Sequence, residues 1–154
     1  MTRFVVDAML GTLAKWLMAL GHDAAYLPHA DDDEILALAK AESRVVLTRD
    51  AELASRAGAA GFIVSRGDLD HQLAEVVARY PETDSEPLSR CLECNGVLAA
   101  ATKSEALASG CVPDGVAERF DEFWRCPCCK KIYWKGSHYA AMRKKIDAIL
   151  GRAR

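Results

Sequence analysis

Several features that mark other protein classes are missing from this chain. No segment approaches the roughly 20 apolar residues of a membrane-spanning helix, and the N-terminus reaches the acidic Asp7 without the apolar stretch of a secretory signal. The first 90 residues contain no cysteine, and all six cysteines lie between positions 91 and 129. We therefore expect a cytoplasmic protein with no membrane partner. In a reducing compartment its cysteines would be free thiols or metal ligands rather than disulfides.

The sequence signatures of several catalytic machineries are also missing. The chain has no G-x-x-x-x-G-K-[ST] phosphate loop, no G-x-G-x-x-G after a predicted strand and no G-x-S-x-G nucleophile elbow. His22, His29 and His71 are isolated, and we expect them at the surface or in the core rather than in catalysis. Carboxylates and cysteines remain as the groups that carry chemistry.

Charge is distributed unevenly along a chain of otherwise ordinary composition. The 154 residues are 51% hydrophobic and 27% charged, which is typical of a globular protein. Residues 1–88 hold 8 Lys/Arg against 15 Asp/Glu, whereas residues 89–154 hold 12 against 7. The acidic half suits a cation and the basic half suits a polyanion, although a solvated surface without a partner would give the same counts.

Short apolar runs alternate with segments of helical periodicity through the first 80 residues. We predict strands at residues 4–6, 24–27, 45–47 and 61–64, and helices at about 10–20, 31–39, 51–56 and 70–80. This alternation predicts an α/β domain with a parallel sheet flanked by helices. The acidic, proline-containing segment 81–87 predicts a linker, so we place one domain at residues 1–86 and a second at 87–154.

Aspartates follow two of the predicted strands. Asp7 comes directly after residues 4–6, and Asp50 comes two residues after the strand that ends at Leu47. The carboxyl ends of parallel strands meet at one edge of a sheet, so both carboxylates should lie at that edge. Asp33, at the start of the intervening helix, is the natural third member. Asp31, Asp32 and Glu34 compete with it for this place. Asp68, beyond the fourth predicted strand, is a candidate fourth member.

Clustered carboxylates repel one another unless a hard cation neutralises them, so these acids predict a Mg²⁺ or Mn²⁺ site. The alternative is structural, because aspartate is a preferred residue at the start of a helix. Each of Asp7, Asp33 and Asp50 alone fits that role. Their convergence at one sheet edge favours the metal site.

Two cysteine pairs carry the spacing of a tetrahedral metal site. Cys91 and Cys94 form one C-x2-C pair, Cys126 and Cys129 form the other, and 31 residues separate them. Four thiolates close the coordination shell, so we predict a structural zinc ion in a ribbon-like module. A redox C-x-x-C pair is the weaker alternative, since one pair would suffice. Cys111 and Cys128 are predicted to be free thiols.

Basic and aromatic residues interleave after the second cysteine pair. The segment from Lys130 to Tyr139 is followed by a predicted C-terminal helix with further basic residues. Cations beside stacking surfaces suit single-stranded nucleic acid. The alternative is that Ile132 and Trp134 form a strand packed inward. The candidate residues for contact with nucleic acid are Lys130, Lys131, Lys135 and His138, and for His138 a role at the sheet edge or no chemical role stays open.

These motifs together resemble the family named for the C-terminal domain of the Mut-seven exonuclease, which is assigned to the PIN-like ribonucleases. The resemblance spans most of the chain. It is carried by residues 4–11 (FVVDAMLG), 13–21, 33–36, 44–50 (RVVLTRD), 72–73, both cysteine pairs and 132–138 (IYWKGSH). One departure is Met18, where the family pattern suggests a basic residue two places after Trp16.

The resemblance implies a PIN-like sheet domain with a zinc ribbon and metal-dependent cleavage of single-stranded RNA. Transferred to this chain, the acidic metal site falls on Asp7, Asp33 and Asp50, and Thr48 and Arg49 shape it or contact phosphate. We infer hydrolysis of a phosphodiester bond assisted by one or two metal ions.

The competing hypothesis is a non-catalytic module that binds RNA or another protein, in which the acids only cap helices. A toxin paired with an antitoxin protein is a biological variant of the ribonuclease. The RNA, single-stranded or structured, and the oligomeric state are left open by the sequence.

Overall fold

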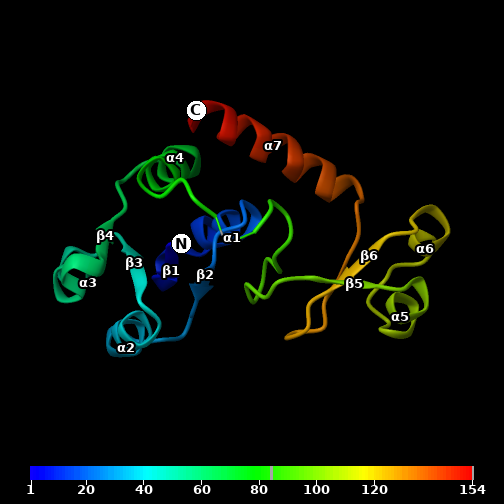
Figure 1. Cartoon of the computed structure of the whole chain (residues 1–154), viewed down its shortest axis with the longest axis horizontal. Coiled ribbons are helices and arrows are strands. Elements are labelled where there is room, and N and C mark those ends of the chain that lie inside the picture. The colour runs from blue at the N-terminus through cyan, green and yellow to red at the C-terminus, as the bar shows by residue number, and fades with distance from the viewer. Residues whose placement is uncertain (84, 154) are drawn as a thin grey trace.

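The structure, a computed structural model, describes residues 1–83 and 85–153 and contains two sheets with their helices (Figure 1). The first part comprises β1 (Arg3–Val6), η1 (Ala8–Leu10), α1 (Gly11–Ala19), β2 (Ala24–Tyr26), α2 (Asp32–Glu42), β3 (Arg44–Thr48), α3 (Ala51–Ala57), η2 (Gly58–Ala60), β4 (Gly61–Ile63) and α4 (Leu69–Arg79). The second comprises β5 (Ala99–Ala101), α5 (Lys103–Ala108), α6 (Val116–Arg119), β6 (Phe123–Arg125), β7 (Ile132–Tyr133) and α7 (Ser137–Ala153). Asp84, within the predicted linker, and Arg154 lie outside the described residues.

The first sheet is parallel, with strand order β2-β1-β3-β4. A helix separates each strand from the next, and such a crossover returns the chain so that the following strand runs in the same direction. The predicted strands and helices of the first half are all present. The α/β class with a parallel sheet flanked by helices is therefore confirmed.

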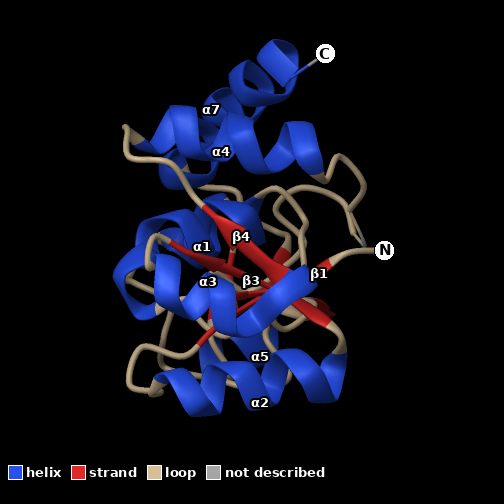
Figure 2. Cartoon of the chain, turned by 90° about the vertical axis from the view of Figure 1, so that its left-hand side faces the viewer, coloured by secondary structure: helices blue, strands red, loops and turns tan. Residues whose placement is uncertain are grey.

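Helices cover both faces of this sheet (Figure 2), and its side chains alternate between the two faces. Phe4 and Val6 of β1 pack on the side of α1 and α4, whereas Val5 between them packs on the side of α2 and α3. All three side chains are fully buried. Burying a side chain of this size stabilises the fold by about 1.5–3 kcal/mol, so the alternation sets which helices cover which face.

The end of the linker and the residue after it are hydrogen-bonded to the end of α1. The backbone N–H of Leu88 donates to the carbonyl oxygen of Ala19 at 2.8 Å, and the Ser85 hydroxyl donates to the carbonyl oxygen of Gly21 at 3.0 Å. Gly21 has φ +99°, and a Cβ there would clash with the Ser85 carbonyl oxygen. Glycine is thus required at position 21 both by its backbone conformation and by the close approach of the linker.

The second sheet is a small antiparallel one, ordered β5-β6-β7. The buried side chains of its core are Ala106, Val116, Phe123 and Ile132. The long spacer between the cysteine pairs supplies most of this module, namely β5, α5, α6 and β6. So few buried residues give a weak core, which fits a module held together by a metal.

Helix α7 follows the small sheet in sequence but packs on the first one. Met142, Ile146 and Ile149 are buried in the same cluster as residues of α1 and α4, and α7 runs from the small sheet back across α4 (Figure 1). Lys145 also pairs with Asp70 of α4 at 3.5 Å. The C-terminal helix therefore links the two parts of the chain. In the part that the structure describes, no helix combines the length and apolarity needed to cross a membrane.

Candidate functional site

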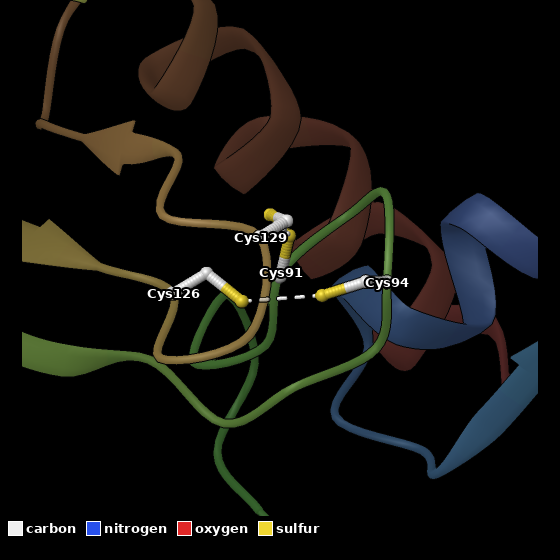
Figure 3. Close-up of side chains that lie close together, drawn as sticks. All are labelled: Cys91, Cys94, Cys126 and Cys129. Carbon is white, nitrogen blue, oxygen red and sulfur yellow. Dashed lines mark hydrogen bonds between the residues drawn. The ribbon is translucent and has the colours of Figure 1, made fainter.

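The four predicted zinc ligands come together. The Sγ atoms of Cys91, Cys94, Cys126 and Cys129 all lie within 4.8 Å of one another (Figure 3). The Cys94–Cys126 sulfur separation is 3.1 Å and the Cys91–Cys129 separation is 3.6 Å. Tetrahedral zinc with Zn–S bonds of about 2.3 Å needs sulfurs roughly 3.8 Å apart, so this cluster fits a structural zinc ion. Cys111 and Cys128 are exposed and outside the cluster.

Each cysteine pair sits on a turn of the same design. The N–H of Asn95 donates to the Cys91 carbonyl at 3.0 Å, and the N–H of Lys130 donates to the Cys126 carbonyl at 2.9 Å. Asn95 has φ 71° and Lys130 has φ 68°, which is the left-handed conformation. Two equivalent turns facing each other present their sulfurs to one point.

The ionisation of the thiols differs across the cluster. Burial opposes ionisation of Cys126, but the backbone N–H groups of Cys129 and Cys128 and the Cys94 thiol donate to it and lower its pKa to about 6. Burial and the hydrogen bond to Cys126 raise the pKa of Cys94 to about 12. The hydrogen bonds that lower the pKa of Cys126 favour its thiolate, the form in which cysteine binds a metal ion.

Tyr133 is a residue of this centre that the sequence did not reveal. Its hydroxyl oxygen lies 3.2 Å from Cys91 Sγ and accepts a hydrogen bond from the Leu92 N–H at 3.1 Å. A zinc-bound Cys91 would be a thiolate without a proton, so in the zinc-loaded centre the hydroxyl would be the donor to the sulfur. Burial and the adjacent Cys91 raise the pKa of Tyr133, so it stays protonated and orients a metal ligand. The sequence signal that could have identified Tyr133 is its position on the strand that follows the second cysteine pair.

Asn95 joins the cysteine centre to the edge of the parallel sheet. Its amide nitrogen donates to Asp23 Oδ1 at 2.6 Å, and its Oδ1 accepts from the backbone N–H of Ala24, the first residue of β2, at 3.0 Å. Asp23 also accepts from Arg44 at 2.7 Å. The first cysteine turn is thus hydrogen-bonded to both backbone and side chain of the other module.

At the carboxyl edge of the parallel sheet, one hydroxyl connects two of the predicted acids. The Thr48 hydroxyl donates to Asp7 Oδ2 at 2.7 Å and accepts from the backbone N–H of Asp50 at 2.9 Å. Thr48 is fully buried and Asp7 is 8% exposed. This contact brings the ends of β1 and β3 together, as their parallel neighbouring positions require.

At this edge, the helices that follow β1 and β3 pass to opposite faces of the sheet. After β1 the chain enters α1 on one face, and after β3 it enters α3 on the other. The crevice between two neighbouring strands whose helices diverge in this way is the usual ligand site of open α/β sheets. Asp7 directly follows β1 and Asp50 closely follows β3, so both stand at the carboxyl ends of these two strands.

The same acids also cap helices, as the alternative interpretation expected. Asp7 Oδ1 accepts from the Ala8 N–H at the start of η1, and Asp50 Oδ1 accepts from the N–H groups of Glu52 and Leu53 at the start of α3. Asp68 caps α4 in this way. Capping engages Oδ1 of Asp7 and Asp50, so it does not by itself exclude a second role.

Asp33 lies apart from the first two acids. It pairs with Arg56 at 2.5 Å, and Arg56 belongs to the last turn of α3, whereas Asp50 precedes its first residue. Six residues of helix separate these positions by about 9 Å. Asp31, not Asp33, caps α2. Among the described residues, Asp7, Asp33 and Asp50 do not form a group with ligand atoms within 4.8 Å of one another, as the four cysteines do.

The predicted RNA-contacting residues lie on the second module and on the sheet edge. Lys130, Lys135 and His138 are exposed, as is Arg49 beside Thr48. Lys131 pairs with Glu93 at 2.8 Å. Ile132 is 3% exposed in the core of the small sheet, and the half-buried Trp134 packs against that core, as the alternative interpretation proposed for both.

The remaining residues singled out in the sequence are placed as follows. His22 is buried with its ring 5.4 Å from that of Phe4, and His29 and His71 are exposed. Met18 is 1% exposed in the core, a position that would not present a charge to solvent.

Comparison with known families gives one match. The family profile described as Mut7-C RNAse domain matches residues 2–146, nearly the whole chain. Searches of curated proteins and of solved structures returned no match.

Proposed function

The chain belongs to the Mut7-C RNase domain family, and from this premise we propose that it is a metal-dependent ribonuclease that hydrolyses phosphodiester bonds of single-stranded RNA. The reaction would take place at the carboxyl edge of the PIN-like parallel sheet. The observation that carries the proposal is that the Thr48 hydroxyl joins the Asp7 carboxylate to the backbone of Asp50 at the carboxyl ends of β1 and β3.

The donor atoms at this edge suit Mg²⁺ or Mn²⁺, because both ions prefer carboxylate oxygens. Thr48 and the Ala8 N–H hold the Asp7 carboxylate in a fixed orientation, and two backbone N–H groups hold Asp50. Asp33 is the proposed third ligand and would exchange its pairing with Arg56 for the ion, with Asp32, Glu34 and Asp68 as further acidic candidates. A bound ion would supply activation of water and stabilise charge on the leaving oxygen.

The basic residues would hold the RNA backbone. In this proposal Arg49 contacts phosphate beside the acids, and Lys130, Lys131, Lys135 and His138 extend the binding surface onto the ribbon. Zinc would act structurally, keeping that surface docked on the sheet through Asn95. Cytoplasmic location and a toxin role, with an antitoxin protein as partner, belong to the same proposal. Growth arrest on expression would test the toxin role.

A second candidate function is a non-catalytic RNA- or protein-binding module. The observation that favours it is that Asp7, Asp50 and Asp68 each cap a helix. The two candidates differ in whether the Asp50 carboxylate does anything that an amide cannot do. Asparagine caps a helix about as well as aspartate but lacks the charge that a metal ion needs.

Asp50→Asn therefore separates the two candidates. Cleavage of a labelled single-stranded RNA in Mg²⁺ or Mn²⁺ should fall at least about a hundredfold, since catalysis would lose a metal ligand while the helix keeps its cap. Asp121→Asn, which removes an exposed acid paired with Lys103 on the ribbon, is the charge-matched control and should cleave normally. Unchanged cleavage by Asp50→Asn, or no metal-dependent cleavage by the wild-type protein, would favour the binding module.

A further inference from the structure

A cavity of about 790 Å³ lies where the ribbon, the linker and the start of α7 meet α1. Its walls come from β6 and β7, from residues 88–93, from the first turns of α7 and from Lys15 of α1. Small-ligand sites typically enclose about 300–1,000 Å³, so the cavity has room for a nucleotide. None of the proposed catalytic acids lines it.

Aromatic side chains are concentrated around this cavity. Trp124, Tyr133, Trp134 and Tyr139 all line it, although aromatic residues make up 7% of the chain. Trp134 packs so closely on Gly136 that a Cβ at Gly136 would lie 2.9 Å from the indole nitrogen. This contact fixes the indole against the turn that leads into α7. Rings held in this way offer flat surfaces on which a base can stack.

The charge around the cavity is complementary to a phosphate backbone. Its lining residues include four Lys/Arg side chains and one histidine against a single acid, Glu93. Glu93 pairs with Lys131, and Arg90 is held by Ser85 and the Asn95 carbonyl. Lys15 and Lys135 therefore provide the positive charge on opposite sides, one from the sheet module and one from the ribbon.

Lys135 lies over two of the rings at once. Its Nζ is 5.5 Å from the centroid of Trp124 and 5.8 Å from that of Tyr139. Its pairing with Glu122 is loose at 3.8 Å, and both side chains are more than half exposed. A flexible lysine over two aromatic faces can move aside to a phosphate and leave those faces to a base.

From these observations we propose that the cavity binds one unpaired nucleotide of a single-stranded RNA, with the base against Trp124 and Tyr139 and its phosphates on Lys135 and Lys15. The inference rests on the proposed function, because it takes RNA as the ligand. It adds a preference for unpaired RNA, because a base in an RNA double helix would have to leave its pair before it could enter the cavity. The strand would then continue past α1, the helix that begins close after Asp7.

The test is binding, measured on the zinc-loaded full chain without added Mg²⁺ or Mn²⁺. The probe is a labelled oligoadenylate of about ten nucleotides, within the site sizes of single-strand-binding folds. Fluorescence anisotropy gives the affinity, and quenching of tryptophan fluorescence reports stacking near Trp124 and Trp134. The single strand should bind at least about tenfold more tightly than the same strand annealed to oligouridylate.

Two variants probe the cavity and two serve as controls. Tyr139→Ala should weaken single-strand binding about tenfold through loss of a stacking surface, whereas Tyr139→Phe keeps the ring and should bind normally. Lys135→Gln should lower the salt dependence of log affinity by about 0.7, as expected for one phosphate contact. Lys103→Gln, an exposed lysine of α5 outside the cavity lining, should behave like wild type.

Equal affinity for single strand and duplex, or unchanged binding by both Tyr139→Ala and Lys135→Gln, would overturn the proposal. If Tyr139→Ala loses zinc or helix content, the exposed Lys135→Gln decides alone. Cleavage that persists while both variants bind normally rejects the cavity and leaves the ribonuclease standing. Single-strand binding that depends on both residues, without any cleavage, supports the cavity and rejects the ribonuclease.

Discussion

Asp23 connects three parts of the molecule through one carboxylate. Burial opposes its ionisation, but hydrogen bonds from Arg44 and Asn95 outweigh that effect and lower the pKa of Asp23 below its ordinary value. Arg44 is itself buried and also donates to the carbonyl of Phe4 in β1. A single ionised group thereby holds the first cysteine turn, β1 and β3 in register.

This arrangement predicts a pH dependence of stability. Because the folded-state pKa of Asp23 is depressed, its contribution is present above the unfolded pKa of about 3.9 and is lost as pH falls through the lower folded value. Asp23→Asn should therefore be less stable than wild type at pH 7, with a difference that shrinks below about pH 4. Urea unfolding of both proteins at a series of pH values from 7 down to 3 measures this difference in stability.

The control for this measurement is Asp121→Asn, whose carboxylate is almost fully exposed. Its stability should differ little from wild type at any pH. A stability difference for Asp23→Asn that stays constant down to pH 3 would contradict the assigned role.

At the scale of elements, the two cysteine turns and the small antiparallel sheet depend on each other. Four buried side chains form the core of this module, whereas the parallel sheet is packed on both faces. The turn at Lys130 lies in the hairpin between β6 and β7, and the turn at Asn95 lies between the bridged residues Arg90 and Val97. Metal binding and folding of the ribbon should therefore be one process.

Cys128 and Cys129 allow this coupling to be tested with neighbouring residues. Cys129→Ser removes a sulfur of the cluster, so zinc content should fall and the amides of β5, β6 and β7 should exchange rapidly. Cys128→Ser changes an exposed thiol and should keep both zinc and protection. The amides of β1 and β3 should stay protected in both variants.

Metal analysis combined with hydrogen exchange gives both quantities on the same samples. Removal of zinc from the wild-type protein by a chelator should reproduce the Cys129→Ser pattern. A ribbon that remains protected after zinc removal would show that its apolar core is sufficient, contrary to this expectation.

At the scale of the whole molecule, α7 ties the ribbon to the parallel sheet. Ile146 is fully buried between α1 and α4, although it follows the ribbon in sequence. The predicted division at residues 86 and 87 stays a prediction, and the packing of α7 shows that the helix after the ribbon completes the core of the first part. The two parts are therefore expected to unfold together.

Ile146→Ala tests this coupling. Truncation of a buried isoleucine typically costs about 2–5 kcal/mol, so the whole chain should lose stability by that amount. Lys144→Ala, at an exposed position of the same helix, should change stability by less than about 0.5 kcal/mol. The measurement is thermal unfolding, recorded with one signal from the parallel sheet and a second signal from the ribbon. A change confined to the ribbon would contradict the coupling.

The secondary structure of the first half and the pairing of the cysteines could be predicted from local sequence. The alternation of apolar runs is a property of neighbouring residues, so it was sufficient to predict the parallel sheet and its helices. The C-x2-C spacing was likewise sufficient to predict which four cysteines come together, because each pair is built on its own short turn. Asp7 and Asp50 could be placed at one edge because parallel strands end on the same side.

Only the tertiary structure decided how these pieces meet. That Thr48 joins Asp7 to Asp50, that Asp33 turns to Arg56, and that Asn95 docks on Asp23 depends on residues far apart in sequence. The aromatic cavity and the return of α7 arise in the same way. Local propensity acts over a few residues, whereas these contacts depend on the packing of whole elements against one another, which no local pattern encodes.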